Sequence, residues 1–166
     1  RARRDPTLRG KVFRADIRRI PLALLFDRVV NLFTSFGYFQ DEDDNRRGFN
    51  ALARHVDRGG VLILDHMNAG RIRRTLVPES VSHREEYRIV QQRRIDGRRV
   101  RKRIELTRIT DGRQWNFYED VRMYDPVEMI EMARNAGFTG VTLHGSFDGE
   151  PYEADSERMI LRAVRS

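Results

Sequence analysis

The chain of 166 residues contains no cysteine. This absence excludes disulfide bonds, thiolate metal sites and a cysteine nucleophile. A protein without thiols needs no oxidising compartment, so we expect a cytoplasmic protein.

Lysine is almost absent as well. Lys11 and Lys102 are the only two lysines, so arginine supplies nearly all of the formal net charge of +7. Such one-sided use of arginine is typical of codon bias. It does not by itself indicate a surface selected for binding phosphate groups.

Long apolar runs and metal-ligand clusters are also missing. No stretch approaches the roughly 20 apolar residues of a membrane span, and residues 1–10 lack the apolar centre of a secretory signal. The four histidines lie far apart, without the spacing of metal ligands. We therefore expect neither a membrane segment nor a metal site.

What the chain does contain is an alternation of strand-like and helix-like segments. Residues 26–33 (FDRVVNLF) and 61–66 (VLILDH) are almost continuously apolar, which is typical of buried parallel strands. Further strands are expected at residues 11–15, 138–145 and 158–165. The fold class that this order predicts is α/β, with an open, Rossmann-like sheet.

Two helices are predicted between these strands. Acidic residues crowd the first turn of the segment 41–57, and glycines follow it at positions 59 and 60. The segment 125–137 begins with Asp125 as N-cap, Pro126 in the first turn and Glu128 to complete a capping box. Gly137 is expected to end it.

Residues 81–123 differ from the rest of the chain in their pattern of charged and apolar residues. Charged and apolar residues alternate there, and the dipeptide Asp96-Gly97 is a strong signal for a tight hairpin turn. We expect three antiparallel strands with one face covered and the other in water. The predicted organisation is a core of residues 1–80 and 124–166, with an antiparallel β insertion at 81–123.

Polar side chains follow three of the predicted strands. Asp16 ends the first, the segment 31–38 ends the second, and Asp65, His66 and Asn68 end the third. In open α/β sheets, ligands bind at the carboxyl ends of the parallel strands. We therefore expect Asp16, Asn31 and His66 to converge on one cavity.

At this point the residues resemble a known family. The segments ADIRRIP, FDRVVNLFTSFGYF, GGVLILDHMN, DPVEMIEMARNAGF and SFDGEPYEADSERMILRAVR together are similar to class I S-adenosylmethionine-dependent methyltransferases. The resemblance is closest to small-molecule members that carry a β insertion. It implies a seven-stranded sheet whose last strand is antiparallel, with S-adenosylmethionine as cofactor across the strand ends.

Two family features do not occur in this sequence. These are the glycine-rich loop after the first strand, which cradles the methionine and ribose, and the acidic residue that holds the ribose hydroxyls. The alignment of motifs implies a chain that starts just before the family's third strand. We interpret it as a fragment of a longer protein in preference to a degenerate domain.

The resemblance also implies roles for individual residues. Asp16 would accept a hydrogen bond from the adenine amino group and Ile17 would contact the ring, while Asn31, Leu32 and Phe33 would pass the methionine part and the sulfonium. The alternatives are purely structural: Asp16 would cap a turn, and Asn31 would only end a buried strand.

The acceptor side is predicted from the following segments. Ser35, Phe36, Gly37 and Tyr38 would form the wall between donor and acceptor. His66 is the candidate general base, with Tyr38 and Asp65 as alternatives, although a lone histidine is more often structural. Three further residues could orient the acceptor: Asn68, Arg122 and Tyr124.

The acceptor is expected to be a small molecule with an oxygen or nitrogen nucleophile, methylated by in-line displacement. The segment NLFTSF lacks the Asn/Asp-Pro-Pro-aromatic motif of enzymes that methylate bases, and without cysteine no covalent attack on a pyrimidine is available. Two alternatives stay open: RNA binding through the arginine-rich hairpin 93–103, and a non-catalytic interaction domain.

The segment FDRVVNLF is too apolar for the open edge of a sheet, yet no preceding strand is available to pair with it. Open apolar edges recruit other chains. A homodimer through this edge or through the β insertion is therefore expected.

Overall fold

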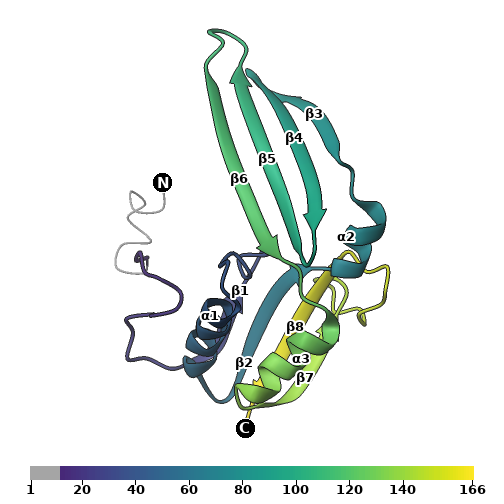
Figure 1. Cartoon of the computed structure of the whole chain (residues 1–166). Helices are drawn as coiled ribbons and strands as arrows, with labels where there is room; N and C mark the ends of the chain where they lie inside the picture. The colour runs from purple at the N-terminus through teal and green to yellow at the C-terminus, as the bar shows by residue number, and fades with distance from the viewer. Residues whose placement is uncertain (1–11) are drawn as a thin grey trace.

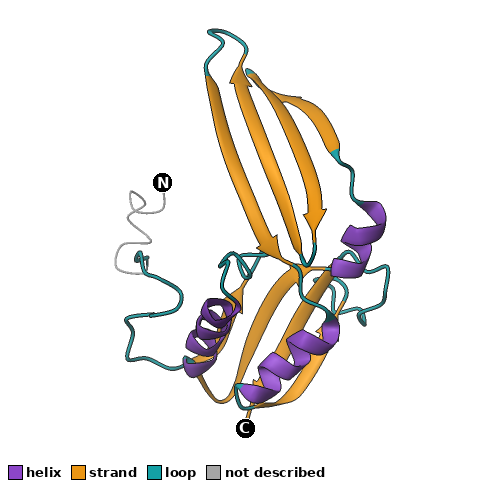
Figure 2. Cartoon of the chain, viewed as in Figure 1, coloured by secondary structure: helices purple, strands orange, loops and turns teal. Residues whose placement is uncertain are grey.

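The computed structural model describes residues 12–166, which form two four-stranded sheets and three helices (Figure 1). The lower sheet in this view carries two of the helices, and the upper sheet stands clear of it with no helix over its faces (Figure 2). Among the described residues, no helix is long and apolar enough to cross a membrane.

The core sheet has the strand order β1-β2-β8-β7. Its strands are β1 (Phe26–Asn31), β2 (Val56–Met67), β8 (Arg158–Arg165) and β7 (Phe138–His144). β1 and β2 are parallel, whereas β8 lies antiparallel between β2 and β7. The predicted α/β class with an antiparallel last strand is confirmed.

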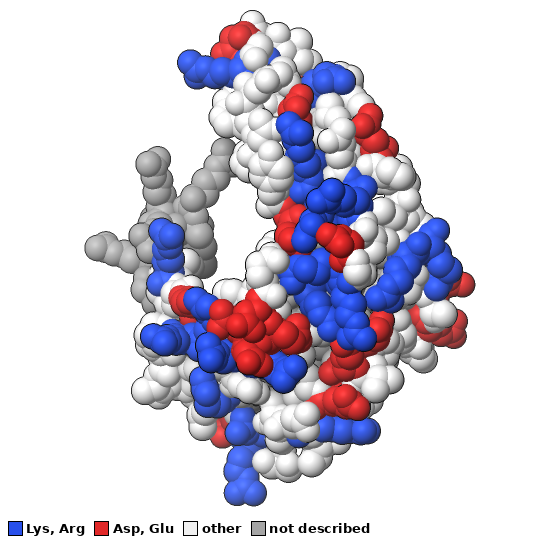
Figure 3. Space-filling view, viewed as in Figure 1, with Lys and Arg blue, Asp and Glu red and all other residues white. Residues whose placement is uncertain are grey.

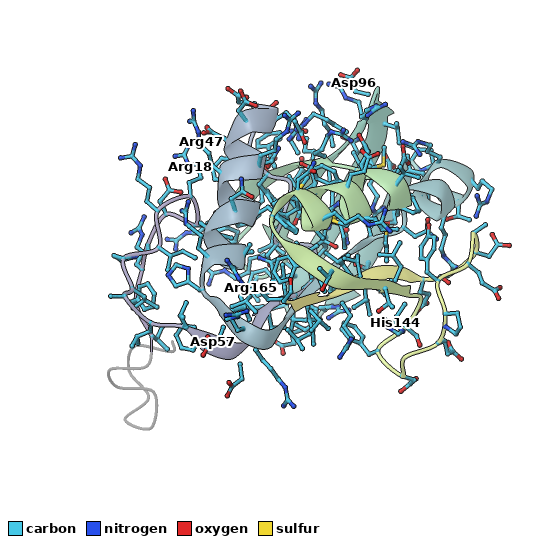
Figure 4. The ribbon with its side chains drawn as sticks, turned by 90° about the horizontal axis from the view of Figure 1, so that it is seen from below. Arg18, Arg47, Asp57, Asp96, His144 and Arg165 are labelled. Atoms are coloured by element: carbon cyan, nitrogen blue, oxygen red, sulfur yellow. The ribbon has the colours of Figure 1, made fainter. Side chains whose placement is uncertain are left out.

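Helices α1 (Glu42–Arg54) and α3 (Pro126–Asn135) cover the same side of the core sheet (Figure 4). Asp41 caps α1 by accepting from the Asp43 amide at 2.8 Å. The capping box of Asp125 and Glu128 at the start of α3 is present as predicted. Both helices pack over a core of fully buried side chains that includes Phe49, Leu62, Leu64, Met129 and Leu161.

Two predicted boundaries were wrong. Residues 12–15 form no strand, because no partner strand among the described residues pairs with them; Lys11 lies outside the described range. The second error concerns the glycines at positions 59 and 60, which lie within β2 and do not end the helix. α1 ends at Arg54, where the amide of the C-cap His55 bonds to the carbonyls of Leu52 and Ala53.

The edge strand β1 is mostly exposed, contrary to the buried strand that its sequence predicted. Phe26 is 39% and Val30 48% exposed, and only Asn31 of this strand is buried. One side of β1 pairs with β2, and no strand among residues 12–166 pairs with the other.

A second sheet follows the short helix α2 (Ala69–Thr75). Its four antiparallel strands occur in chain order: β3 (Glu79–Arg84), β4 (Tyr87–Asp96), β5 (Arg99–Arg108) and β6 (Gln114–Arg122). The turn at Asp96-Gly97 is confirmed, with Gly97 at φ +56°. The sequence predicted three strands, and both α2 and β3 were missed.

The expectation that one face of this insertion is covered was wrong. Val121 is the only buried residue in β3–β6, and it lies at the end nearest the core. Over most of its length, neither face of the sheet packs against a helix or strand of the described residues, because the strands extend beyond the core (Figure 1).

Candidate functional site

The carboxyl ends of β1 and β2 lie side by side, since Asn31 pairs in register with Leu64. Asn31 is 7% exposed, and its Oδ1 atom is buried without a hydrogen-bond partner among residues 12–166. A buried amide oxygen without a donor costs about 1–3 kcal/mol. The atom lies at the end of the sheet where α/β folds bind their ligands.

The turn that follows β1 is held in an unusual backbone conformation. Phe33 and Thr34 both adopt left-handed φ values, of +57° and +54°. Each such residue costs about 1–2 kcal/mol when it is not glycine. Strain of this kind persists only where surrounding groups enforce it, and it is common at functional sites.

Asp65, fully buried on β2, enforces this turn. Its Oδ2 accepts from the Phe33 amide at 2.7 Å, and its backbone carbonyl accepts from the Thr34 amide at 3.1 Å. Arg158 of β8 closes the arrangement with two hydrogen bonds of 2.6 Å to the Asp65 carboxylate. Both carboxylate oxygens are therefore engaged, which favours a structural role for Asp65 over a role as base.

The loop after this turn forms a wall beside the strand ends. Ser35 donates from Oγ to the Leu32 carbonyl at 2.6 Å, and Phe36 is buried in the core. Gly37 has φ +93°, and a Cβ there would lie 2.9 Å from the Arg122 carbonyl oxygen. Only glycine permits this close approach to the insertion.

Tyr38 is the exposed member of the wall, with 46% of its surface accessible. Partial burial, together with the nearby Glu119 carboxylate, raises the pKa of its phenol. Tyr38 is therefore a neutral hydrogen-bond donor at physiological pH and a poor base.

His66 is fully buried, and its ring lies near those of Phe36 and Tyr124, at centroid distances of 6.5 and 5.6 Å. Its Nε2 lies 3.0 Å from the Arg122 carbonyl, and since a carbonyl only accepts, Nε2 carries the proton. Nδ1 is buried, and no group in the described part of the chain bonds to it. Burial lowers the pKa of His66 to about 4, so the ring is neutral and weakly basic.

The three residues expected to orient an acceptor are engaged within the chain. Asn68 caps α2 and donates from Nδ2 to the carbonyls of Ala154 and Ser156 at 3.0 and 2.9 Å. This set of bonds favours a role for Asn68 in holding the loop before β8.

Arg122 and Tyr124 join the insertion to the helices. The Arg122 guanidinium contacts Glu128 at 2.7 Å and Glu42 at 3.4 Å, and it lies over the Tyr124 ring. Tyr124 is buried and donates from its hydroxyl to Glu42 at 3.1 Å. Burial and the Glu42 carboxylate raise the pKa of Tyr124.

Asp16 and Ile17 lie in the loop before β1 and not at a strand end. The Asp16 carboxylate pairs with Arg18 at 2.6 Å, and this hydrogen bond lowers its pKa to about 2. Ile17 packs near Gly48 of α1. His66 has no exposed surface, whereas the Asp16 side chain is 42% exposed. The convergence of Asp16, Asn31 and His66 on one cavity stays a prediction.

The arginine-rich hairpin 93–103 carries largely paired charges. Arg99 and Arg101 both bind Asp120, at 2.5 and 3.0 Å, and Lys102 lies 3.5 Å from Glu119. Basic and acidic side chains accordingly alternate on the surface seen in Figure 3. Pairing of this kind reduces the positive field that a phosphate backbone would meet.

Neither a protein-family model nor a curated protein matches the sequence of this chain. Solved structures do match. An S-adenosylmethionine-dependent methyltransferase from Clostridium acetobutylicum ATCC 824 is 17% identical, with a TM-score of 0.82 over 96% of this chain and 68% of that one.

Two sugar-modifying enzymes are also similar. CalS10, an amino pentose methyltransferase from Micromonospora echinaspora with S-adenosylmethionine bound, is 21% identical, with a TM-score of 0.65 over 92% of this chain and 63% of that one. The sugar N-methyltransferase KedS8 from Streptoalloteichus sp ATCC 53650 is 23% identical, with a TM-score of 0.65 over 91% and 60%. The chain thus spans 60–68% of these three structures and shares their Rossmann-like fold.

Proposed function

From the fold that it shares with S-adenosylmethionine-dependent methyltransferases, we propose that this chain belongs to an enzyme that methylates a small molecule on oxygen or nitrogen. The single observation that carries the proposal is the unpartnered Oδ1 of Asn31, buried at the carboxyl end of β1 beside the strained turn of Phe33 and Thr34. That position is where an α/β sheet binds its ligand.

The residues at this end suit a cationic methyl donor. S-adenosylmethionine, when bound, supplies a methyl group already activated on a positively charged sulfur. The Asn31 oxygen can face that positive charge without adding a nucleophilic anion. Phe33, whose side chain is 76% exposed, offers an aromatic ring for a cation–π contact of roughly 0.5–2 kcal/mol.

Asp16 and Ile17 are proposed to meet the adenine. The lowered pKa keeps Asp16 a carboxylate at neutral pH, so it can accept from an amino group. Leu32 is proposed to pass the methionine part through its backbone, beside Asn31.

On the acceptor side, we assign Ser35 and Tyr38 to contact with the substrate. Both are exposed on the wall that follows β1. His66, Asn68, Arg122 and Tyr124 would act as positioning residues, because their polar groups hold the wall, the insertion and the loop before β8 in place.

A nitrogen acceptor is favoured over a hydroxyl. A hydroxyl needs a base during transfer, and His66 is enclosed with a pKa of about 4 while the pKa of Tyr38 is raised. A neutral amine attacks with its own lone pair, the bond from carbon to sulfur breaks, and the resulting ammonium later releases a proton to water. The similarity to CalS10, an amino pentose methyltransferase, and to KedS8, a sugar N-methyltransferase, supports an amino-sugar acceptor.

The test combines donor binding with methyl transfer. Calorimetry should detect binding of S-adenosylmethionine, and transfer of a labelled methyl group should favour amino sugars over matched hydroxy sugars. Tyr38→Phe should raise KM for the acceptor by roughly 2- to 10-fold, the value of one neutral hydrogen bond, without changing donor affinity. No heat with the donor, together with RNA binding that falls steeply with salt, would favour the RNA-binding alternative.

A further inference from the structure

One arginine at the base of the insertion sheet contacts the loop that carries the acceptor-side wall. Arg99 is the first residue of β5, and β5 begins at the end of the insertion nearest the core (Figure 1). Its side chain is only 14% exposed. A charged group that is this enclosed destabilises the fold unless its N–H groups are bonded. The partners of Arg99 therefore show what this side chain holds in place.

The Arg99 guanidinium binds the backbone on both sides of Tyr38. Its Nη1 donates to the Phe39 carbonyl at 3.0 Å, and its Nη2 donates to the Gly37 carbonyl at 3.4 Å. These two carbonyls belong to the residues immediately before and after Tyr38. One side chain of the insertion thus holds both neighbours of the exposed tyrosine of the wall.

The other N–H groups of Arg99 are fixed to the insertion itself. Nε donates to the Asp120 carboxylate at 2.5 Å, and Nη2 also donates to the Asp120 carbonyl at 2.9 Å. Asp120 lies on β6, next to β5. The planar fork of a guanidinium can bond to acceptors in several fixed directions at once, whereas a lysine ammonium on a flexible stem cannot. Arginine is therefore the residue that suits this position.

The same stretch of backbone is held from two further directions. The fully buried Asn45 of α1 donates from Nδ2 to the Phe39 carbonyl at 3.1 Å and accepts from the Phe39 amide at 3.2 Å. The Arg122 amide donates to the Gly37 carbonyl at 2.8 Å. Because 46% of the Tyr38 surface is accessible, the direction of its ring depends mainly on this held backbone.

We propose that Arg99 is a positioning residue for the methyl acceptor, which fixes the direction of Tyr38 by holding the carbonyls on either side of it. The proposal rests on the proposed function, since it requires Tyr38 to contact the acceptor. Arg99 acts through Tyr38 and not by touching the acceptor, because its guanidinium is bonded to Asp120 and to the wall. The insertion sheet thereby becomes part of the acceptor site.

Arg101 offers a matched control. It binds the same Asp120 carboxylate at 3.0 Å and pairs with Asp96 at 2.6 Å, but within residues 12–166 no bond joins it to the wall. Arg99→Lys should raise KM for an amino sugar by roughly 2- to 10-fold, as Tyr38→Phe does, and change the affinity for S-adenosylmethionine by less than about twofold. Arg101→Lys should change both quantities by less than about twofold.

Combination with Tyr38→Phe separates positioning from a general structural effect. When the Tyr38 hydroxyl is already absent, Arg99→Lys should raise KM by less than about twofold, because residues that act through one another are not additive. Circular dichroism checks that the variants fold. If Arg99→Lys does not fold, Asp120→Asn takes its place with the same expectations, because it loosens Arg99 without removing it.

Hydrogen exchange of the free chain gives a readout that needs neither donor nor acceptor. The Phe39 and Arg122 amides both bond within the held stretch, to Asn45 and to the Gly37 carbonyl. Arg99→Lys should speed exchange at these two amides by at least roughly 10-fold, the value of a hydrogen bond to a charged group, and Arg101→Lys should not.

Three outcomes would overturn the proposal. They are equal KM effects of Arg99→Lys and Arg101→Lys, a full effect of Arg99→Lys in the Tyr38→Phe background, and unchanged exchange at the Phe39 and Arg122 amides. A wild type that neither binds S-adenosylmethionine nor methylates an amino sugar would refute the proposed function, and the acceptor role of Arg99 with it. The exchange rates would then still show whether Arg99 holds the wall, so the two failures are distinguishable.

Discussion

Titration of His66 is expected to dominate the acid sensitivity of this fold. The ring is fully buried, donates from Nε2 to the Arg122 carbonyl, and leaves Nδ1 without a partner that could share a second proton. Burial lowers its pKa from 6.5 to about 4. The neutral ring thus ties the end of β2 to the end of the insertion sheet.

The direction and size of the effect follow from this pKa difference. Above pH 6.5 the ring is neutral in both the folded and the unfolded chain. Between pH 6.5 and 4 the unfolded chain takes up a proton that the folded chain refuses, so stability is lost as pH falls. The two pKa values differ by about 2.5, and one pKa unit corresponds to roughly 1.4 kcal/mol. The free energy of unfolding should therefore fall by about 3 kcal/mol, and the loss should be complete near pH 4.

The assay is urea unfolding at a series of pH values, followed by circular dichroism, for the wild type and His66→Gln. Glutamine keeps an N–H donor for the Arg122 carbonyl but does not titrate. The other ionisable groups cancel in the difference between the two proteins. Wild-type stability relative to His66→Gln should fall by about 3 kcal/mol between pH 7 and pH 4.

A difference that stays constant over this range would refute the reasoning, because it would mean that His66 titrates alike in both states. A wild type that gains stability relative to His66→Gln on acidification would refute it more strongly. That result would require a partner for the protonated ring.

Two further predictions concern the wall and the turn after β1, and both are read from urea unfolding. Gly37→Ala should lower the free energy of unfolding by roughly 3 kcal/mol, because it adds left-handed strain to a Cβ contact of 2.9 Å with the Arg122 carbonyl oxygen. The control Gly149→Ala, at φ +86° with open space around it, should lower it by only about 1 kcal/mol. Equal losses in the two variants would contradict the close approach of Gly37 to the insertion. Asp65→Asn should cost about 3 kcal/mol, because it leaves the Arg158 guanidinium without its carboxylate, and a cost below about 1 kcal/mol would show that the pair does not enforce the turn.

Local signals account for the parts of the fold that the sequence predicted well. The acidic first turn of α1, the capping box of α3 and the Asp96-Gly97 turn each depend on a few neighbouring residues. The strand β3 has no such signal. Its pairing depends on β4, as when Val81 faces Val90, and the short helix α2 lies between two segments that look like loops.

The candidate site was predicted in part. Adjacent ends of β1 and β2 follow from the pattern of buried parallel strands, and Asn31 lies there as expected. The clamp of Asp65 and Arg158 joins residues 93 positions apart, and no local pattern predicts such a pair. The burial of His66 likewise depends on Phe36 and Tyr124, which come from separate segments of the chain.

The central claim is that the buried Asn31 oxygen faces the positive charge of a methyl donor. Its most direct test is calorimetric titration of the wild type, Asn31→Asp and Asn31→Leu with S-adenosylmethionine and with S-adenosylhomocysteine, which lacks the sulfonium charge. Asn31→Leu should weaken S-adenosylmethionine binding by about 10-fold or more, the value of a hydrogen bond or contact to a charged group, and weaken S-adenosylhomocysteine less, while Asn31→Asp keeps the affinity. An Asn31→Leu variant that binds S-adenosylmethionine as tightly as the wild type would contradict the account.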